Sequence, residues 1–271
     1  FLTNALVYPI VKVQQLKKQF RIIVILVFMT IGNILFYLGV VGFIEQGMYW
    51  SIYGGLYLVI GLIIIMGRRV IPFFIEVGVG YPVKLFNSKW LDIAIPLLYL
   101  AFFIVEVFVG NRHLSALLSA GLFIMTSVRL IGWHTIGIWK KPLLWSLFVA
   151  FLFIDLGFLL IALSPFTDLP NIRVIHAFSF GGIGVMTLSM MARVTLGHTG
   201  RNVQNPPGAM TWAFVALIVG AVVRVILPLI AADYYLIWIA VSQILWITAF
   251  LIFVVVYAPM LIKPRIDGQF G

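Results

Sequence analysis

The sequence predicts an all-α fold: a polytopic bundle of about eight transmembrane helices with both ends of the chain on the cytoplasmic side. Composition is the first reason, since 63% of the 271 residues are hydrophobic and only 10% are charged. Soluble domains use about 45–50% apolar and about 25% charged residues. The second reason is that the apolar residues form long runs, and the third is that basic residues concentrate in alternate loops.

Eight apolar runs approach the roughly 20 residues that a helix needs to cross about 30 Å of hydrocarbon. The runs lack the period-two alternation of a transmembrane β-barrel, so helices are expected throughout. We predict one membrane domain over residues 1–271. In chain order, the predicted spans are 20–43, 49–66, 91–110, 114–132, 142–163, 172–194, 208–230 and 234–258.

Loop charges set the predicted orientation, because short loops rich in lysine and arginine stay in the cytoplasm. Basic residues alternate from side to side in step with the predicted spans. The basic set is Lys12, Lys17, Lys18, Arg21, Arg68, Arg69, Lys84, Lys89, Lys140, Lys141, Arg201, Lys263 and Arg265. The opposite set is Glu45, Arg112, Asp168, Arg173 and Asp233.

The longest internal loop is expected to run from Gly67 to Trp90 on the cytoplasmic side. It contains two prolines and several basic residues. We expect it to lie at the membrane interface, with Phe73 and Phe74 dipping into the headgroup region.

Composition also excludes several kinds of site. The chain has no cysteine, which excludes disulfides, iron–sulfur clusters and thiolate metal sites within it. The net charge of +10 is divided among short clusters between apolar runs, which is typical of topology signals and not of a nucleic-acid-binding surface. No general acid–base pair, nucleophile or nucleotide-binding loop is recognisable, so the sequence assigns no catalytic residue.

Three histidines near the ends of predicted spans are candidate metal ligands, with an ordinary hydrogen-bonded histidine as the alternative for each. His134 ends the fourth span and His198 follows the sixth, so both belong to the cytoplasmic side and can converge. His176 lies one turn inside the outer end of the sixth span. At 1.5 Å per residue it is about 30 Å from His198. If both are functional, they therefore belong to two separate sites near opposite membrane faces.

Other residues in the spans also allow two interpretations. Gly181 and Gly184 let either another helix or a flat cofactor approach closely. Arg193 and Arg201 are cytoplasmic anchors or partners of an anion such as a haem propionate. Glu106 is expected to reach out of the third span towards water.

Asp155 and Arg224 are charged residues within predicted spans. A charge at membrane depth needs a partner or contact with water. We expect the two residues to form a structural ion pair, or alternatively to line a pathway for a proton or ion.

Residues 176–201, HAFSFGGIGVMTLSMMARVTLGHTGR, resemble the hallmark segment of the NnrS family. RLIGWHT at 129–135 and GRRVIPFF at 67–74 are also similar to that family. The resemblance implies a multi-pass protein of the bacterial inner membrane that binds haem and copper. It further implies a role in nitric oxide metabolism or defence against nitrosative stress.

The same resemblance implies which molecules the protein contacts and which residues form its functional site. Nitric oxide or an iron–nitrosyl species is the expected small-molecule partner, beside the lipid bilayer itself, and no nucleic acid is expected. The family also has an early His-x-His-Glu-Met motif that is absent here, so the chain is expected to lack an N-terminal part of about four helices. The implied metal ligands are His134, His176 and His198, and the implied cofactor contacts are Gly181, Gly184, Arg193 and Arg201.

Two other functions are compatible with the residues alone. One is a transporter or permease in which Asp155 and Arg224 line the path. The other is a quinone-linked or assembly subunit with a structural role.

Overall fold

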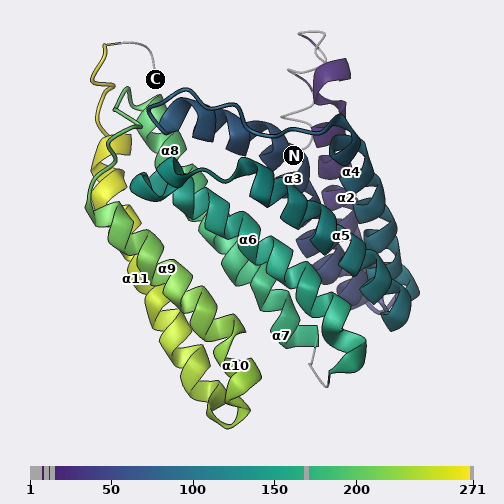
Figure 1. Cartoon of the computed structure of the whole chain (residues 1–271). Helices are drawn as coiled ribbons and strands as arrows, with labels where there is room; N and C mark the ends of the chain where they lie inside the picture. The colour runs from purple at the N-terminus through teal and green to yellow at the C-terminus, as the bar shows by residue number, and fades with distance from the viewer. Residues whose placement is uncertain (1–7, 9–11, 13–15, 168–170, 269–271) are drawn as a thin grey trace.

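The computed structural model describes residues 8, 12, 16–167 and 171–268. Within this part of the chain every regular element is helical and no strand occurs. Eight helical segments are long and apolar enough to cross a membrane. They lie side by side in one bundle (Figure 1). The predicted all-α membrane bundle is confirmed.

The first four spans form one half of the bundle. The turn between the first two is tight, since a Cβ on Gly39 would lie 2.6 Å from the backbone nitrogen of Met48. Close backbone contact of this kind is what small residues permit in membrane helices. The elements are α2 (Leu16–Val40), α3 (Gly47–Gly78), α4 (Lys89–Ile104) with the π-helix η1 (Val105–Val109), and α5 (Arg112–Trp133).

The last four spans contain several changes of helix type. The sixth span is a continuous series in which a π-helix joins two α-helices. The elements are η2 (Ile136–Lys140), α6 (Pro142–Leu163), η3 (Ser164–Phe166), α7 (Asn171–His176), η4 (Ala177–Gly184), α8 (Val185–His198), α9 (Ala209–Val225), α10 (Leu227–Ile230), η5 (Ala232–Tyr234) and α11 (Tyr235–Leu261).

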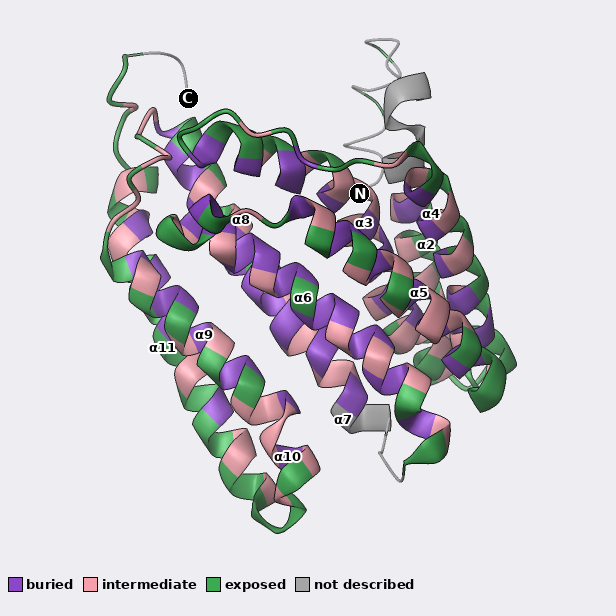
Figure 2. Cartoon of the chain, viewed as in Figure 1, coloured by how far each residue is buried: buried purple, intermediate pink, exposed green. Residues whose placement is uncertain are grey.

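The core of the bundle is centred on α6. In the span that contains α6, 67% of the residues of the apolar window are buried, against 6% for α2. The purple of buried residues is accordingly concentrated along α6 (Figure 2). A helix that is apolar all round suits a position surrounded by protein or lipid on every side. Phe151, Ile154 and Phe158 of α6 are fully buried.

The predicted loop at 67–90 is wrong in its first half. α3 continues through Pro72 to Gly78, and only residues 79–88 connect it to α4. At 1.5 Å per residue this helix of 32 residues is about 48 Å long, which exceeds the hydrocarbon thickness of about 30 Å. Phe73 is exposed, whereas the ring of Phe74 is covered by Arg193.

Arg68 explains why the apolar run underestimates this helix. Its guanidinium lies 2.8 Å from the carboxylate of Asp92, which also contacts Arg129 at 2.9 Å. The positive charge of Arg68, which ends the apolar run, is thus balanced by the carboxylate of Asp92 on α4. Gly78 then fits against α6, where a Cβ would lie 3.0 Å from Leu144.

Both described ends of the chain lie at the same end of the bundle. The start of α2 and the end of α11 are together at the top of Figure 1, as an even number of spans requires. The opposite end is called the outer end here, following the predicted orientation. Asp168 and the side chains of Lys17, Lys18, Arg21 and Arg173, which were used for that prediction, lie outside the described residues.

Candidate functional site

A pocket of about 400 Å³ lies between η4, α9 and α11 in the outer half of the bundle. Its volume falls within the range of small-molecule sites. The walls combine a few polar groups with aromatic rings. They are formed by His176, Ser179, Phe180, Arg224, Ser242, Gln243, Trp246 and Ile247.

His176 and Arg224 meet in this pocket. Nη2 of Arg224 lies 2.9 Å from Nε2 of His176. A guanidinium only donates hydrogen bonds, so Nε2 is the acceptor and a neutral ring carries its proton on Nδ1. Nη1 of Arg224 is buried and has no hydrogen-bond partner among the described residues. An unpaired charged donor is costly, which favours an anionic group beside it.

Asp155 does not pair with Arg224, so this prediction is wrong. Its side chain is 6% exposed and accepts hydrogen bonds from Thr126 and, at 2.6 Å, from Ser127. Two hydroxyl groups of α5 therefore satisfy the carboxylate on α6. Asp155 is not among the residues that line the pocket of Arg224.

The glycines of η4 face neighbouring helices. A Cβ on Gly181 would lie 2.3 Å from the Phe153 ring of α6, and a Cβ on Gly184 would lie 2.4 Å from the Trp246 ring of α11. These rings occupy the space that the missing side chains leave. The structure thus shows close packing of helices at both glycines, one of the two interpretations the sequence left open. Gly184 also shapes the pocket, because its missing side chain leaves the space in which the ring of Trp246, a lining residue, lies.

The cytoplasmic histidines are exposed. His134 caps the end of α5, and its Nε2 accepts a hydrogen bond of 3.1 Å from Nε1 of Trp139. His198 is the last residue of α8, not a residue beyond the span as predicted. In the described part of the chain, no group of three or more His, Cys, Asp or Glu is placed to hold a metal ion. Convergence of His134 and His198 stays a prediction.

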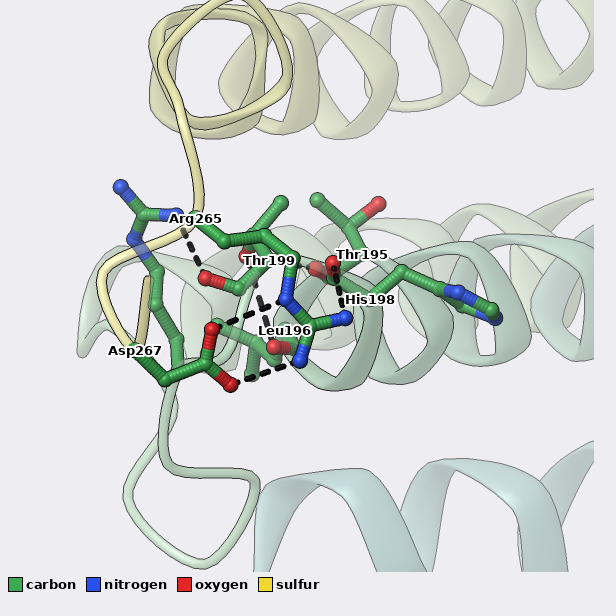
Figure 3. A network of polar contacts seen from close by, with 7 residues as sticks. Thr195, Leu196, His198, Thr199, Arg265 and Asp267 are labelled. Carbon is green, nitrogen blue, oxygen red and sulfur yellow. Dashed lines mark hydrogen bonds and ion pairs between the residues drawn. The ribbon is translucent and has the colours of Figure 1, made fainter. Parts of the chain in front are cut away.

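The segment that follows α11 is held beside His198 by Arg265 (Figure 3). Arg265 makes two hydrogen bonds to Asp267, of 2.9 and 2.6 Å, and donates to the carbonyl of His198 at 3.2 Å. The carboxylate of Asp267 raises the pKa of Arg265 above its ordinary value. The ring of His198 extends away from this pair.

The two candidate anion partners have other contacts. The guanidinium of Arg193 lies 3.6 Å above the centre of the Phe74 ring and joins α8 to α3. Nη1 of Arg201 donates to the carbonyl of Thr199 at 3.4 Å. Their predicted role in cofactor binding stays a prediction.

A comparison with models of protein families shows the family to which the chain belongs. The family model of the NnrS protein matches residues 1–265. The chain belongs to the NnrS family. The resemblance drawn from residues 176–201 is thereby confirmed, and with it the link of this NnrS-type membrane protein to the nitric oxide response. No curated protein and no solved structure matches the chain.

Sequence reasoning missed the contribution of α11 to the site of this NnrS protein. Ser242 and Gln243 are adjacent polar residues within a mostly apolar helix, which is the signal that was available. It also missed a second outer pocket, of about 220 Å³, beside Glu106. There the available signal was three tyrosines, Tyr49, Tyr53 and Tyr57, at a spacing of four residues on α3.

Proposed function

We propose that this NnrS protein binds haem in the pocket of His176 and Arg224 and acts on nitric oxide in the bacterial inner membrane. One observation carries the proposal: an imidazole nitrogen and a guanidinium with an unpaired N–H converge in a pocket of about 400 Å³. Family membership supports the choice of cofactor.

The residues of the pocket fit the chemical groups of haem. Nε2 of His176 is an acceptor, the state in which an imidazole ligates iron. Nη1 of Arg224 is the group that would pair with a propionate. Phe180 and Trp246 supply apolar ring surfaces. When bound, the haem iron would supply the centre at which nitric oxide is held.

In this proposal Arg224 has two tasks. In the structure its Nη2 occupies the lone pair of His176. Coordination of a metal by Nε2 requires that lone pair, so Arg224 would exchange the ring for an anionic partner when the cofactor enters. The same residue thus keeps the imidazole oriented and compensates the charge of the cofactor.

Copper does not fit a site made by the described residues alone. His134 and His198 are exposed, and in the described part of the chain neither belongs to a group of three or more His, Cys, Asp or Glu that could hold a metal ion. We derive no step from copper. The transporter alternative is not favoured either, because Asp155 and Arg224 belong to separate polar contacts.

Purified full-length protein tests the proposal after incubation with haem. We expect a Soret band that shifts when nitric oxide is added to the reduced protein. His176→Ala should abolish the band, and His113→Ala, at an exposed outer position, should leave it unchanged. A wild-type protein that stays colourless, or a band that is insensitive to His176→Ala, would show that the assignment is wrong.

A further inference from the structure

The second outer pocket is enclosed by the outer turns of α3, η1, α5, α6 and α7. Its volume is about 220 Å³. Three tyrosines of α3 form one wall, and Glu106 of the π-helix η1 also lines it. The remaining lining residues are Gly110, Arg112, Ser115, Ile161, Ser164, Val174 and Ile175.

Polar groups of this pocket lack good protein partners. Among the described residues, the hydrogen bond to the carboxylate of Glu106 is a long one, 3.4 Å from the hydroxyl of Tyr57. Ser115 is 2% exposed, and its Oγ has no hydrogen-bond partner in the described part of the chain. Buried polar groups are normally hydrogen-bonded, so the unpaired Oγ of Ser115 indicates a ligand that has a polar group of its own. The half-buried carboxylate of Glu106 has room to accept a further hydrogen bond in the same pocket.

The charges of the pocket favour a neutral ligand. The pocket is lined by both a negative charge, Glu106, and a positive charge, Arg112. A charged ligand of either sign would therefore be attracted by one of them and repelled by the other. The Nη2 of Arg112 is already used, since it donates to the carbonyls of Ser164 and Thr167. The carboxylate of Glu106 accepts hydrogen bonds when it is ionised, so a ligand hydroxyl that donates a hydrogen bond would suit it.

An apolar groove continues from this pocket. The groove has a volume of about 460 Å³ and shares Tyr53 and Ile175 with the polar pocket. From Tyr53 it follows α3 inwards to Val59, a distance of about 9 Å at 1.5 Å per residue. A polar chamber of ring size joined to an apolar groove suits an amphiphile with a small head and a hydrocarbon chain. The other lining residues are Ile52, Gly55, Leu56 and Ile183.

We propose that the pocket and the groove together bind an isoprenoid hydroquinone, with the ring among the tyrosines and the chain in the groove. One ring hydroxyl donates to Glu106, and aromatic walls accommodate the flat ring. A phospholipid is less suitable, because its phosphate would face the carboxylate of Glu106. Ile175 of this site directly precedes His176 of the haem pocket. Binding of the quinol does not itself depend on haem.

The test measures binding of decylubiquinol to the full chain in phosphatidylcholine nanodiscs by isothermal titration calorimetry. The quinol should bind more tightly than decylubiquinone, because the oxidised ring has no hydroxyl to donate to Glu106. Glu106→Gln should weaken quinol binding about tenfold and quinone binding much less. Haem content, read from the Soret band, is measured separately, so failure of the haem proposal is distinguishable from failure of this one.

A second variant tests the groove without touching the polar pocket. Gly55 lines the groove, and a Cβ there would meet no atom within 4 Å. Gly55→Leu should place an apolar side chain in the groove and weaken quinol binding about tenfold. Gly32→Leu on α2, where a Cβ also meets nothing within 4 Å, is the matched control and should bind as the wild type does.

Three outcomes would overturn the proposal. They are equal affinity for quinol and quinone, wild-type quinol affinity in both Glu106→Gln and Gly55→Leu, and displacement of the quinol by phosphatidylethanolamine at equal concentration. The last outcome would identify the site as one for a structural lipid. Thermal unfolding of each variant shows whether it is folded before its affinity is compared.

Discussion

At the scale of single residues, charges within the spans are satisfied by neutral neighbours as well as by opposite charges. Asp155 is held by two hydroxyl groups and Arg224 by an imidazole. A search for opposite charges at similar depth pairs the two with each other and misses both real partners. Hydroxyl and imidazole groups give a weak signal in a sequence, because most serines, threonines and histidines in helices have ordinary roles.

Thr126→Val tests the role of the hydroxyl on Asp155. Valine keeps the shape of threonine but removes the donor to a carboxylate that is 6% exposed. The free energy of unfolding in detergent should fall by about 1–3 kcal/mol. Thr248→Val, whose exposed hydroxyl bonds only its own helix at Ile244, should change it by less than about 0.5 kcal/mol. Equal effects of the two changes would contradict this role of Thr126.

Variants of Arg224 test charge compensation in the proposed haem site without removing the proposed iron ligand, His176. Arg224→Leu should keep His176 but lower haem affinity about tenfold or more, because the anionic group loses its partner. Arg224→Lys should recover part of the affinity, since lysine keeps the charge without the guanidinium fork. Titration of haem, followed by Soret absorbance, measures both. Affinity that is unaffected by Arg224→Leu would exclude the charge role.

At the scale of elements, apolar run length predicted the spans well where they end in loops and poorly where charges occur within a helix. The end of α3 was misplaced because Arg68 and Arg69 interrupt the apolar run, while Asp92 on another helix neutralises the first of them. The π-helices η1 and η4 were not predicted at all. Hydropathy does not distinguish α from π winding, since the same residues are apolar in either.

Both π-helices adjoin a pocket. η1 carries Glu106 to the tyrosine pocket, and η4 begins directly after His176. Single turns of π-helix are frequent at functional sites. His176 could therefore be predicted as a candidate from the sequence, but its partner Arg224 and the pocket walls from α11 could not. Those depend on how helices far apart in the chain pack together.

Packing at η4 is tested by Gly181→Ala. The added Cβ would lie 2.3 Å from the ring of Phe153, so the free energy of unfolding should fall by about 1–3 kcal/mol. Gly197→Ala on α8, where a Cβ meets nothing within 4 Å, should be neutral or slightly stabilising. Combining Gly181→Ala with Phe153→Leu should recover part of the loss. Thermal unfolding of these three variants and of Phe153→Leu alone measures the effects, and strict additivity of the double change would argue against contact.

At the scale of the whole molecule, the bundle has a buried centre at α6 and largely exposed margins, such as α2. The start of α2 and the end of α11 lie at the same end of the bundle, which agrees with the even number of spans among the described residues. The basic loops predict the side of the membrane on which they lie. The absence of cysteine makes this orientation directly measurable.

Single cysteines test the orientation. Lys84→Cys lies in the connection between α3 and α4, and Glu45→Cys lies in the turn between α2 and α3; both positions are exposed. A membrane-impermeant maleimide should label Glu45→Cys in spheroplasts and Lys84→Cys only in inverted vesicles. The unmodified chain is the control without label. The reverse pattern would place the chain ends outside the cell.

The π-helical winding of η4 sets the direction in which His176, before it, points relative to the side chains of α8, after it. Each residue of an α-helix advances the side-chain direction by about 100°, and a π-helix closes its bonds over one residue more. If η4 were rewound as α, His176 would turn relative to α8 by an angle of that order. The imidazole would then no longer point at Arg224. Deleting one residue of η4, or inserting one, is therefore expected to change the direction in which the ring of His176 points.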